Sequence, residues 1–458
     1  MRKDRHFGRA GLGGLAAGLA PVPVLACALP PSIVMTLPTG RYMLGAALTV
    51  ALTGLLAAMA RRLPEMQAHV LASRRVLVPQ TVSSYLGFLL FLGLLGVGIL
   101  GPRDPMHNLW TLVFWTVVWV ALPLASLVFG NLWRGLNPWT GPVRIIRLLT
   151  GWQGSIGLSR LGQSPAVLGL AAFSWFQIVS LSPDDPLILA QVAGAYWLVI
   201  FLLAVAEGED WLEHGEFLTV YFGYLSRIAP FWAQPDGKRL RIMAGWPGTQ
   251  VLTMAPLGAS QVAFVTLALA ALTFDGLRET FWWLALVGEN PLEFSGRSAV
   301  VTENTIGLFA AWGLTAATIL GALALGRRLS GARLAAGPVM LSFLAIAAGY
   351  HGAHYLLTLL TAGQYTLAAL NDPLFQGDAL LGLPPFYVSM GFLTDRGAMT
   401  LIWNAQFAAI LGAHVLAVVL ALQLSARGER GLAHLPLTVL MVGYTILGLW
   451  LLASPTGA

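Results

Sequence analysis

Long apolar segments of about 20 residues recur along this chain, and they limit the folds open to it more than any other feature. A helix needs roughly 20 apolar residues to cross a bilayer, and lipid offers no hydrogen-bond partner to the backbone of an irregular segment. The composition agrees, because 57% of the residues are hydrophobic and only 10% are charged, against about 25% charged in soluble domains. We therefore expect an integral membrane protein with an all-α fold, a polytopic transmembrane helical bundle.

The apolar segments divide the chain into about ten expected spans after an N-terminal signal-like helix. They cover residues 41–60, 81–100, 108–129, 164–181, 186–206, 251–274, 306–325, 336–361, 398–424 and 435–452. We find no convincing internal repeat, so residues 31–458 are expected to form one polytopic membrane domain.

The first 30 residues have the pattern of a secretory signal. Arg2, Lys3 and Arg5 precede an Ala/Leu/Gly run, which ends at the small residues Ala26-Cys27-Ala28. An uncleaved signal anchor is the main alternative, and an imperfect lipoprotein box at Val24-Leu25-Ala26-Cys27 is a weaker one. Cys27 is the only cysteine, so an internal disulfide is excluded.

Charged residues in the loops predict the orientation of the spans. Alternate loops carry basic clusters, such as Arg74-Arg75, Lys238-Arg239 and Arg327-Arg328, whereas the opposite loops carry acids such as Asp184-Asp185. The positive-inside rule places the basic loops in the cytoplasm and the mature N-terminus outside. The net charge of +6 therefore reflects membrane topology, and we expect no nucleic-acid partner.

Three histidines lie within the expected spans and mark the first candidate site. His351 and His354 are three residues apart and share one face of the 336–361 helix, and His414 belongs to the next span. Ionisable groups inside a membrane are costly unless they are paired or ligating, so they predict function. The pair is interpreted as ligating or proton-handling, with a structural role as the alternative, and His414 alone more often serves packing. The spacing lacks the Glu and the four-residue interval of the zinc-protease motif.

Helix geometry limits a site that uses all three histidines. At about 1.5 Å rise per residue, His414 lies roughly 13 Å deeper than His354 and roughly 9 Å deeper than His351. One metal ion, or one haem held by both helices, needs ligands at nearly equal depth. A shared site therefore requires a kink or shifted helix ends.

Acidic residues supply further candidates. Glu207, Glu209 and Asp210 follow the 186–206 span on the basic side, where they form either a solvated helix end or the lining of an inner vestibule. Asp275 and Asp372 lie on the opposite side. Asp372-Pro373 is first of all a turn signal.

Several stretches resemble a bacterial and archaeal family of membrane proteins, the fenitrothion hydrolases. The similarity extends over most of the chain, and the stretches that carry it include Gly208-Glu209-Asp210-Trp211-Leu212, Gly215-Glu216-Phe217, Val220-Tyr221-Phe222-Gly223, Thr273-Phe274-Asp275-Gly276, Ala353-His354-Tyr355, Asp372-Pro373-Leu374 and Gly412-Ala413-His414-Val415. His351 departs from the family pattern, which has an apolar residue at this position. The resemblance implies a multi-pass protein of a prokaryotic cell membrane.

The resemblance also implies an activity, the hydrolysis of lipophilic organophosphate triesters by water. Such chemistry usually uses a metal ion that acidifies the water. The implied metal ligands are His354, His414 and His351, with Asp275 or Asp372 as a carboxylate, while Glu209 and Asp210 are the other candidate catalytic acids. The ion would be zinc, manganese or iron. The implied partners are the lipid bilayer and a lipophilic small-molecule substrate, and a second membrane subunit is left open.

Two other classes remain open. A transporter or permease would use the buried histidines as a proton or metal relay. A redox subunit of a membrane complex would use them to bind haem or copper, although the depth mismatch and the absence of a C-x-x-C-H motif weigh against haem.

Overall fold

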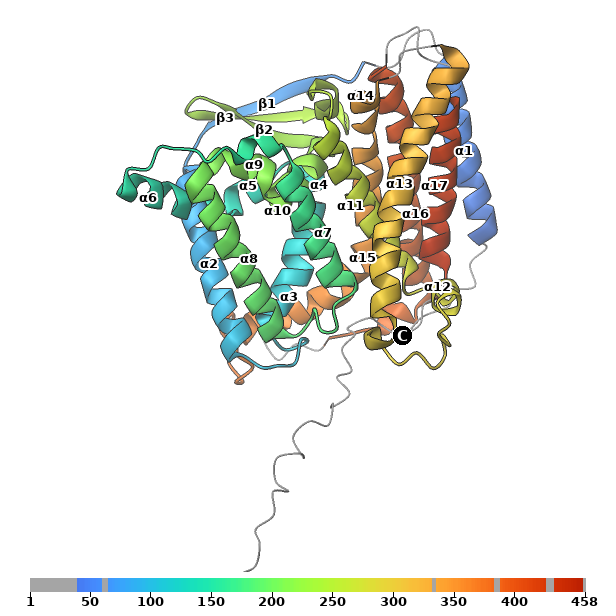
Figure 1. Cartoon of the computed structure of the whole chain (residues 1–458). Coiled ribbons are helices and arrows are strands. Elements are labelled where there is room, and N and C mark those ends of the chain that lie inside the picture. Colours follow the sequence, from blue (N-terminus) through green and yellow to red (C-terminus); the bar gives the residue numbers. More distant parts are fainter. Residues whose placement is uncertain (1–38, 60–64, 332–334, 383–387, 426–431, 456–458) are drawn as a thin grey trace, which may run out of the picture.

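A computed structural model describes residues 39–59, 65–331, 335–382, 388–425 and 432–455, and the expected signal segment 1–30 lies outside this part of the chain. Eight helices among the described residues are long and apolar enough to cross a membrane. They are α2 (Gln80–Leu100), the continuous segment Leu109–Phe129, α8 (Pro186–Glu207), α11 (Ala259–Leu277), Arg297–Ser330, Ala336–Asn371, α16 (Arg396–Gln423) and α17 (Leu435–Ala453). The chain is therefore a multi-pass membrane protein by length and composition of its helices (Figure 1).

The remaining two expected spans are helices as well, but they are not among these eight. α1 (Thr39–Met59) has 21 residues, and α7 (Ser164–Ile178) has only 15. Pro165 stands in the first turn of α7, and Pro183 follows its end. Because proline is tolerated at a helix start and cannot continue a helix interior, Pro165 suits the first turn of α7 and Pro183 prevents the helix from continuing through the next loop.

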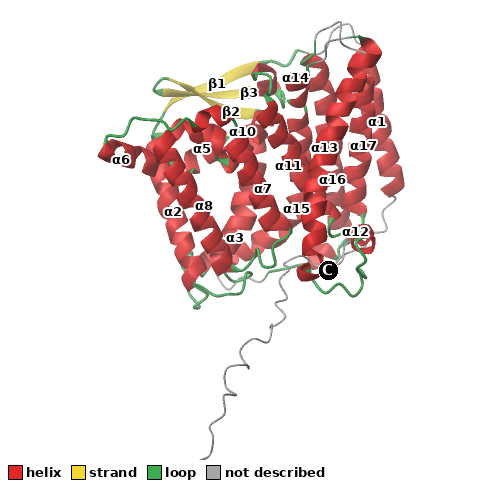
Figure 2. Ribbon diagram, viewed as in Figure 1, coloured by secondary structure: helices red, strands yellow, loops and turns green. Residues whose placement is uncertain are grey.

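A small antiparallel sheet corrects the expectation of a purely helical fold. β1 (Ala68–Arg75), β3 (Arg239–Gly245) and β2 (Phe231–Asp236) lie in the order β1-β3-β2 across one end of the bundle (Figure 2). Asp236 pairs with Arg239 across the turn Gly237-Lys238, where Gly237 has φ +59°. A glycine with positive φ at the first position of a two-residue turn is a hairpin signal that sequence reasoning missed.

Short helices complete the fold. Those at the ends of the spans are α5 (Trp133–Leu136), α6 (Thr140–Thr150), α9 (Leu212–Gly215), α12 (Phe281–Leu286) and α14 (Ala336–Met340). The 3₁₀ turns are η2 (Leu158–Leu161), η3 (Glu209–Trp211), η4 (Ser226–Ile228), η5 (Thr249–Thr253), η6 (Arg297–Val300) and η7 (Gly391–Leu393). Asn137 Oδ1 accepts hydrogen bonds from the Trp139 and Thr140 amides, which form a turn at Asn137-Pro138-Trp139 before α6.

The long helix α15 (Phe343–Asn371) is the centre of the packing that matters for function. It contacts α16 and α11, and on its other side the segment α3 (Leu109–Leu112), η1 (Val113–Ala121) and α4 (Leu122–Phe129). α10 (Phe217–Leu225), which is almost wholly buried, also contacts it. α13 (Val301–Ser330) packs on α11 and α17.

The segment η1 is a π-helix of nine residues, directly before Pro123. Proline has no N–H for the carbonyl four residues earlier, which here is that of Trp119. A π-helix widens the helical turn and is often found at functional sites. The helix is thus irregular just before Pro123, and this segment positions Trp119 against α15.

The two ends of the bundle differ in charge. We call the end with the sheet and with Arg327 and Arg328 the basic end, and the end with Asp184, Asp185, Asp275 and Glu279 the acidic end. α8 and α13 run from the acidic to the basic end, and α11 runs in the opposite direction (Figure 1). This separation agrees with the loop pattern from which the orientation was predicted.

Candidate functional site

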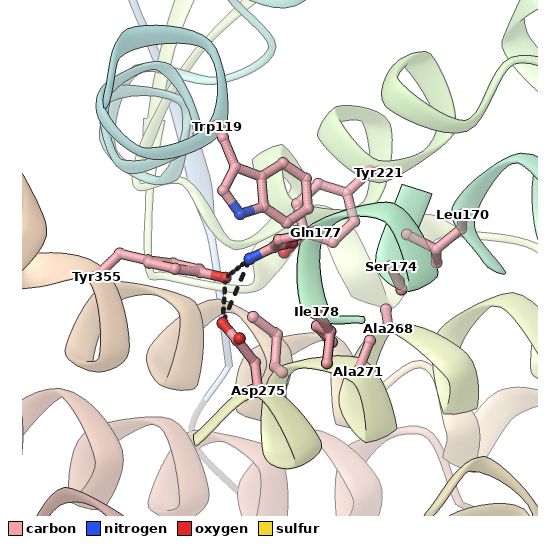
Figure 3. Close-up of a pocket in the computed structure, with 11 residues that line it drawn as sticks. Trp119, Leu170, Ser174, Gln177, Ile178, Tyr221, Ala268, Ala271, Asp275 and Tyr355 are labelled. Atoms are coloured by element: carbon pink, nitrogen blue, oxygen red, sulfur yellow. Dashed lines mark hydrogen bonds between the residues drawn. The ribbon is translucent and has the colours of Figure 1, made fainter. Parts of the chain in front are cut away.

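A carboxylate, an imidazole, a phenol and an amide meet near the acidic end, where α7, α11 and α15 converge. Asp275 lies on the last turn of α11, and only 8% of its side chain is exposed. Its Oδ2 accepts hydrogen bonds from Tyr355 OH and from His354 Nε2, each at 3.0 Å. Gln177 Nε2 of α7 donates to the same oxygen at 3.3 Å and to Tyr355 OH at 2.8 Å. Figure 3 shows Asp275, Tyr355 and Gln177 pointing toward one another.

Arg278 stabilises the buried carboxylate. Its Nε lies 3.2 Å from Asp275 Oδ1, and its other end pairs with Glu279 at 2.6 Å. A negative charge at a helix C-terminus is unfavourable, because the last carbonyls carry partial negative charge. An arginine three residues later offsets this cost, since residues at i and i+3 are neighbours on a helix.

The hydrogen bond to Asp275 determines the tautomer of His354. A carboxylate only accepts, so Nε2 of His354 carries a proton and Nδ1 is the acceptor in the neutral ring. The side chain is 21% exposed, and within the described residues Nδ1 forms no hydrogen bond. The Tyr350 ring stacks on the imidazole, with centroids 5.8 Å apart and planes at 17°. His354 is therefore oriented by Asp275 and keeps one nitrogen able to take up a proton.

His351 belongs to a second polar pair, one helical turn deeper. Its side chain is fully buried, and its Nδ1 lies 2.9 Å from Tyr221 OH of α10. The Trp119 ring of η1 packs edge-on against the imidazole at 5.6 Å, and the Tyr355 ring does the same at 4.8 Å. The side chain of Tyr355 therefore contacts both the Asp275–His354 pair and the Tyr221–His351 pair.

A cavity separates the two pairs; we call it the Asp275 cavity. Its volume is about 10 Å³, which is room for about one water molecule. The residues that line it are Trp119, Leu170, Ser174, Gln177, Ile178, Tyr221, Ala268, Ala271, Leu272, Asp275 and Tyr355 (Figure 3). A water molecule in it would lie between the Asp275–Tyr355 pair and the Tyr221–His351 pair.

His414 does not join this site. It lies on α16 with 2% of its surface exposed, and its Nδ1 donates to the Ile410 carbonyl at 2.8 Å. Within the part of the chain that the structure describes, no group of three or more His, Cys, Asp or Glu side chains could hold a metal ion. The described residues therefore do not supply the ligand set of the expected zinc, manganese or iron site.

The other predicted acids lie elsewhere. Asp372 caps the loop after α15, where its carboxylate accepts hydrogen bonds from the Gln376 and Gly377 amides at 2.8 and 2.7 Å; this confirms the turn reading. Glu209 is at the basic end and pairs with Arg144 at 2.7 Å. Asp210 beside it is exposed. Of the four predicted catalytic acids, only Asp275 contacts a predicted histidine.

Glu207 is a structural residue. It is buried at the end of α8, and its two oxygens accept hydrogen bonds from the amides of residues 156–159 and from the Ser159 hydroxyl. These hydrogen bonds fix the loop before α7. Glu207 therefore belongs neither to a solvated helix end nor to the lining of an inner vestibule, the two alternatives that the sequence suggested.

Sequence reasoning missed three residues of the site. Gln177, Arg278 and Tyr221 were not singled out as site residues. The available signal was their polarity on otherwise apolar helices, since such groups need partners inside a membrane.

The loop beyond the site at the acidic end is also held by charge. Arg297 NH1 donates to the Gln177 carbonyl at 2.8 Å and to that of Ser180 at 3.2 Å. Burial raises the pKa of Asp184 in this loop, and the nearby Arg297 and Arg278 act against that rise. These contacts fix the end of α7 that carries Gln177.

Comparison of the chain with protein-family models, with curated proteins and with solved structures yields no match. The class of the protein therefore rests on the fold and the site. It is a multi-pass membrane protein in which the buried Asp275 carboxylate pairs with His354 and Tyr355 near one end of the bundle.

Proposed function

We propose that this protein translocates protons across the membrane, with Asp275 and His354 as the proton-binding pair of a transporter. One observation carries the proposal: His354 Nε2 lies 3.0 Å from Asp275 Oδ2, inside a bundle of apolar helices. Carboxylates and imidazoles in such positions are typical of proton relays in pumps and transporters.

The hydrogen bonds favour His354 as the group that gains the proton. Asp275 already accepts from His354, Tyr355, Gln177 and Arg278, so protonating the carboxylate would disrupt accepted hydrogen bonds. His354 Nδ1 is free to bind a proton, and the resulting imidazolium would be paired with the carboxylate that already orients it.

The size of the Asp275 cavity supports protons over a bulky substrate. A volume of about 10 Å³ admits about one water molecule. Such a water would connect Asp275 and Tyr355 to Tyr221, whose hydroxyl lies 2.9 Å from His351 Nδ1, so a proton would have hydroxyl and imidazole groups to pass between. A phosphotriester does not fit in this cavity.

Proton flux into proteoliposomes tests the proposal. Wild type, under an imposed membrane potential and with a trapped pH dye, is expected to exceed protein-free liposomes. His354→Gln and Asp275→Asn are each expected to lower that flux at least tenfold, which corresponds to about 1.4 kcal/mol in a barrier. His107→Gln is the matched control, because His107 also pairs with an aspartate, Asp104, at 2.8 Å, but is 41% exposed. The proposal fails if wild type gives no flux, or if folded His354→Gln keeps it.

Hydrolysis is the second candidate, and a separate observation favours it. Thr273–Gly276 and Ala353–Tyr355 both belong to the stretches that resemble fenitrothion hydrolases, and they meet at the Asp275–His354 hydrogen bond. In this reading Asp275 orients His354, whose Nδ1 acts as a general base. The water oxygen bonds to phosphorus, and one water proton passes to Nδ1. The bond between phosphorus and the aryloxy oxygen breaks, so that a phenolate leaves with the electron pair.

The same variants separate the two candidates. Purified protein is incubated with a nitrophenyl phosphotriester, and phenolate release is measured by absorbance. Release that His354→Gln removes, in protein without proton flux, would select the hydrolase. Flux without release would select the transporter.

A further inference from the structure

A second cavity lies on another side of α15, between α11, α15, α16 and α17. We call it the His414 cavity. It is lined by Leu269, Leu272, Thr273, Ile346, Tyr350, His414, Tyr444, Leu447, Gly448 and Leu451. Most of these side chains are apolar, so the polar groups among them determine what the cavity can bind.

Two buried polar atoms of these side chains, Tyr350 OH and His414 Nε2, form no hydrogen bond with the described residues. Tyr350 is 7% exposed and His414 is 2% exposed. Buried polar atoms are nearly always hydrogen-bonded, to protein or to ordered water, so two such atoms at one cavity indicate a missing partner. Thr273 Oγ1 donates to the Leu269 carbonyl at 2.8 Å and retains its capacity to accept.

The tautomer of His414 defines the role of its free nitrogen. Nδ1 lies 2.8 Å from the Ile410 carbonyl, which only accepts, so Nδ1 carries the proton. In the neutral ring Nε2 is then an acceptor and needs a donor. Tyr350 OH can both donate and accept, so one small molecule that donates to Nε2 and bonds the phenol would satisfy both groups.

We propose that the His414 cavity is a binding site for a single water molecule, held by His414 Nε2, Tyr350 OH and Thr273 Oγ1. The volume of about 10 Å³ suits one water, which needs two to four polar partners to stay in an apolar surrounding. Larger ligands are excluded by this size.

The water also gives His414 a function. Tyr350 stacks on His354, and its hydroxyl would meet a β-carbon placed at Gly276, next to Asp275, at 3.0 Å. A water between Tyr350 and His414 therefore extends the polar groups of α11 and α15 to α16, where His414 serves as a second proton acceptor. The location of the water is independent of the proposed function, whereas the role of His414 as a second proton acceptor rests on it.

Two glycines of α17 provide the test. Gly448 lines the cavity, and a β-carbon there would lie 3.5 Å from Ile410 Cδ1 and from Tyr350 Cε2, which is ordinary contact. Gly448→Ala therefore fills the cavity without a clash. Gly443→Ala is the matched control on the same helix, because a β-carbon at Gly443 meets nothing within 4 Å.

The measurement is solid-state NMR of the full-length protein in lipid, with ¹⁵N-labelled histidine. We expect a cross-peak between His414 Nε2 and water protons in wild type and in Gly443→Ala, and its loss in Gly448→Ala. The His414→Gln variant assigns the cross-peak, because it removes the labelled ring. If His414→Gln does not fold, Tyr350→Phe replaces it, since loss of the second partner of the water weakens the same cross-peak. Wild type without the cross-peak, or Gly448→Ala that retains it, overturns the water site. The cross-peak does not depend on proton flux, so failure of the water site and failure of the proposed function are distinguishable.

Discussion

Removing the Tyr355 hydroxyl tests whether the candidate site is held together as described. This hydroxyl donates to Asp275 Oδ2 at 3.0 Å and accepts from Gln177 Nε2 at 2.8 Å. Tyr355→Phe removes both hydrogen bonds, while the ring that packs on His351 and His354 stays in place. The substitution therefore isolates the polar contribution of one atom.

The expected loss follows from the two bonds. Interhelical hydrogen bonds between membrane helices contribute about 0.6 kcal/mol on average and about 1.7 at most. Hydrogen bonds to charged groups contribute about 1.5–3 kcal/mol in general. The bond to Asp275 involves a charge and the bond from Gln177 does not, so we expect Tyr355→Phe to lower the free energy of unfolding by about 2 kcal/mol. Asp275 keeps three donors, so the loss stays well below that of an unpaired buried charge, about 3–5 kcal/mol.

Reversible unfolding in mixed detergent micelles, with increasing denaturing detergent, measures this free energy. Tyr365→Phe is the control, because Tyr365 lies on the same helix and its hydroxyl has no hydrogen bond to any described residue. The control is expected to change stability by less than about 0.5 kcal/mol. Equal small changes in both variants would refute the hydrogen bond between Tyr355 and Asp275, and with it the assembled site.

Two further predictions concern the scaffold. Gly349→Ala is expected to destabilise the protein by about 1–3 kcal/mol in the same assay, because its β-carbon would lie 2.2 Å from Ala413 Cβ and 2.7 Å from the Ala409 carbonyl oxygen of α16. Gly363→Ala on the same helix meets nothing within 4 Å, and equal effects of the two variants would contradict the close α15–α16 contact. Glu207→Gln is expected to speed amide hydrogen exchange of residues 156–159 about tenfold, since hydrogen bonds to a charged acceptor contribute about 1.5 kcal/mol or more. Glu209 pairs with Arg144 and bonds to none of those amides, so Glu209→Gln should leave them unchanged, and protection that survives in Glu207→Gln would argue against the anchoring role.

Some parts of the fold could be predicted because they depend on short stretches of chain. Each long apolar segment must form a helix in lipid whatever its neighbours are, since its backbone groups have no other partners there. The same holds for local turns such as Asn137-Pro138-Trp139 and Asp372-Pro373, whose side chains bond to nearby amides. The hairpin at Asp236-Gly237 carried an equally local signal, which was overlooked.

Only some members of the candidate site were predictable, and their contacts were not. Asp275 and His354 were both identified as unusual polar residues, but their contact joins positions 79 residues apart, and Gln177 is 98 residues from Asp275. The three histidines were considered as one site, whereas His354 bonds to Asp275 of α11, His351 to Tyr221 of α10 and His414 to the Ile410 carbonyl of its own helix.

The sequence alone therefore determined that this is a membrane protein with many helical spans, because apolar length and loop charge are sums over neighbouring residues. Only the tertiary structure decided which buried polar groups are partners. A hydrogen bond requires atoms within about 3 Å, and that proximity depends on how helices far apart in the chain pack and rotate against one another. The Asp275–His354 pair and the separate His414 cavity are products of that packing.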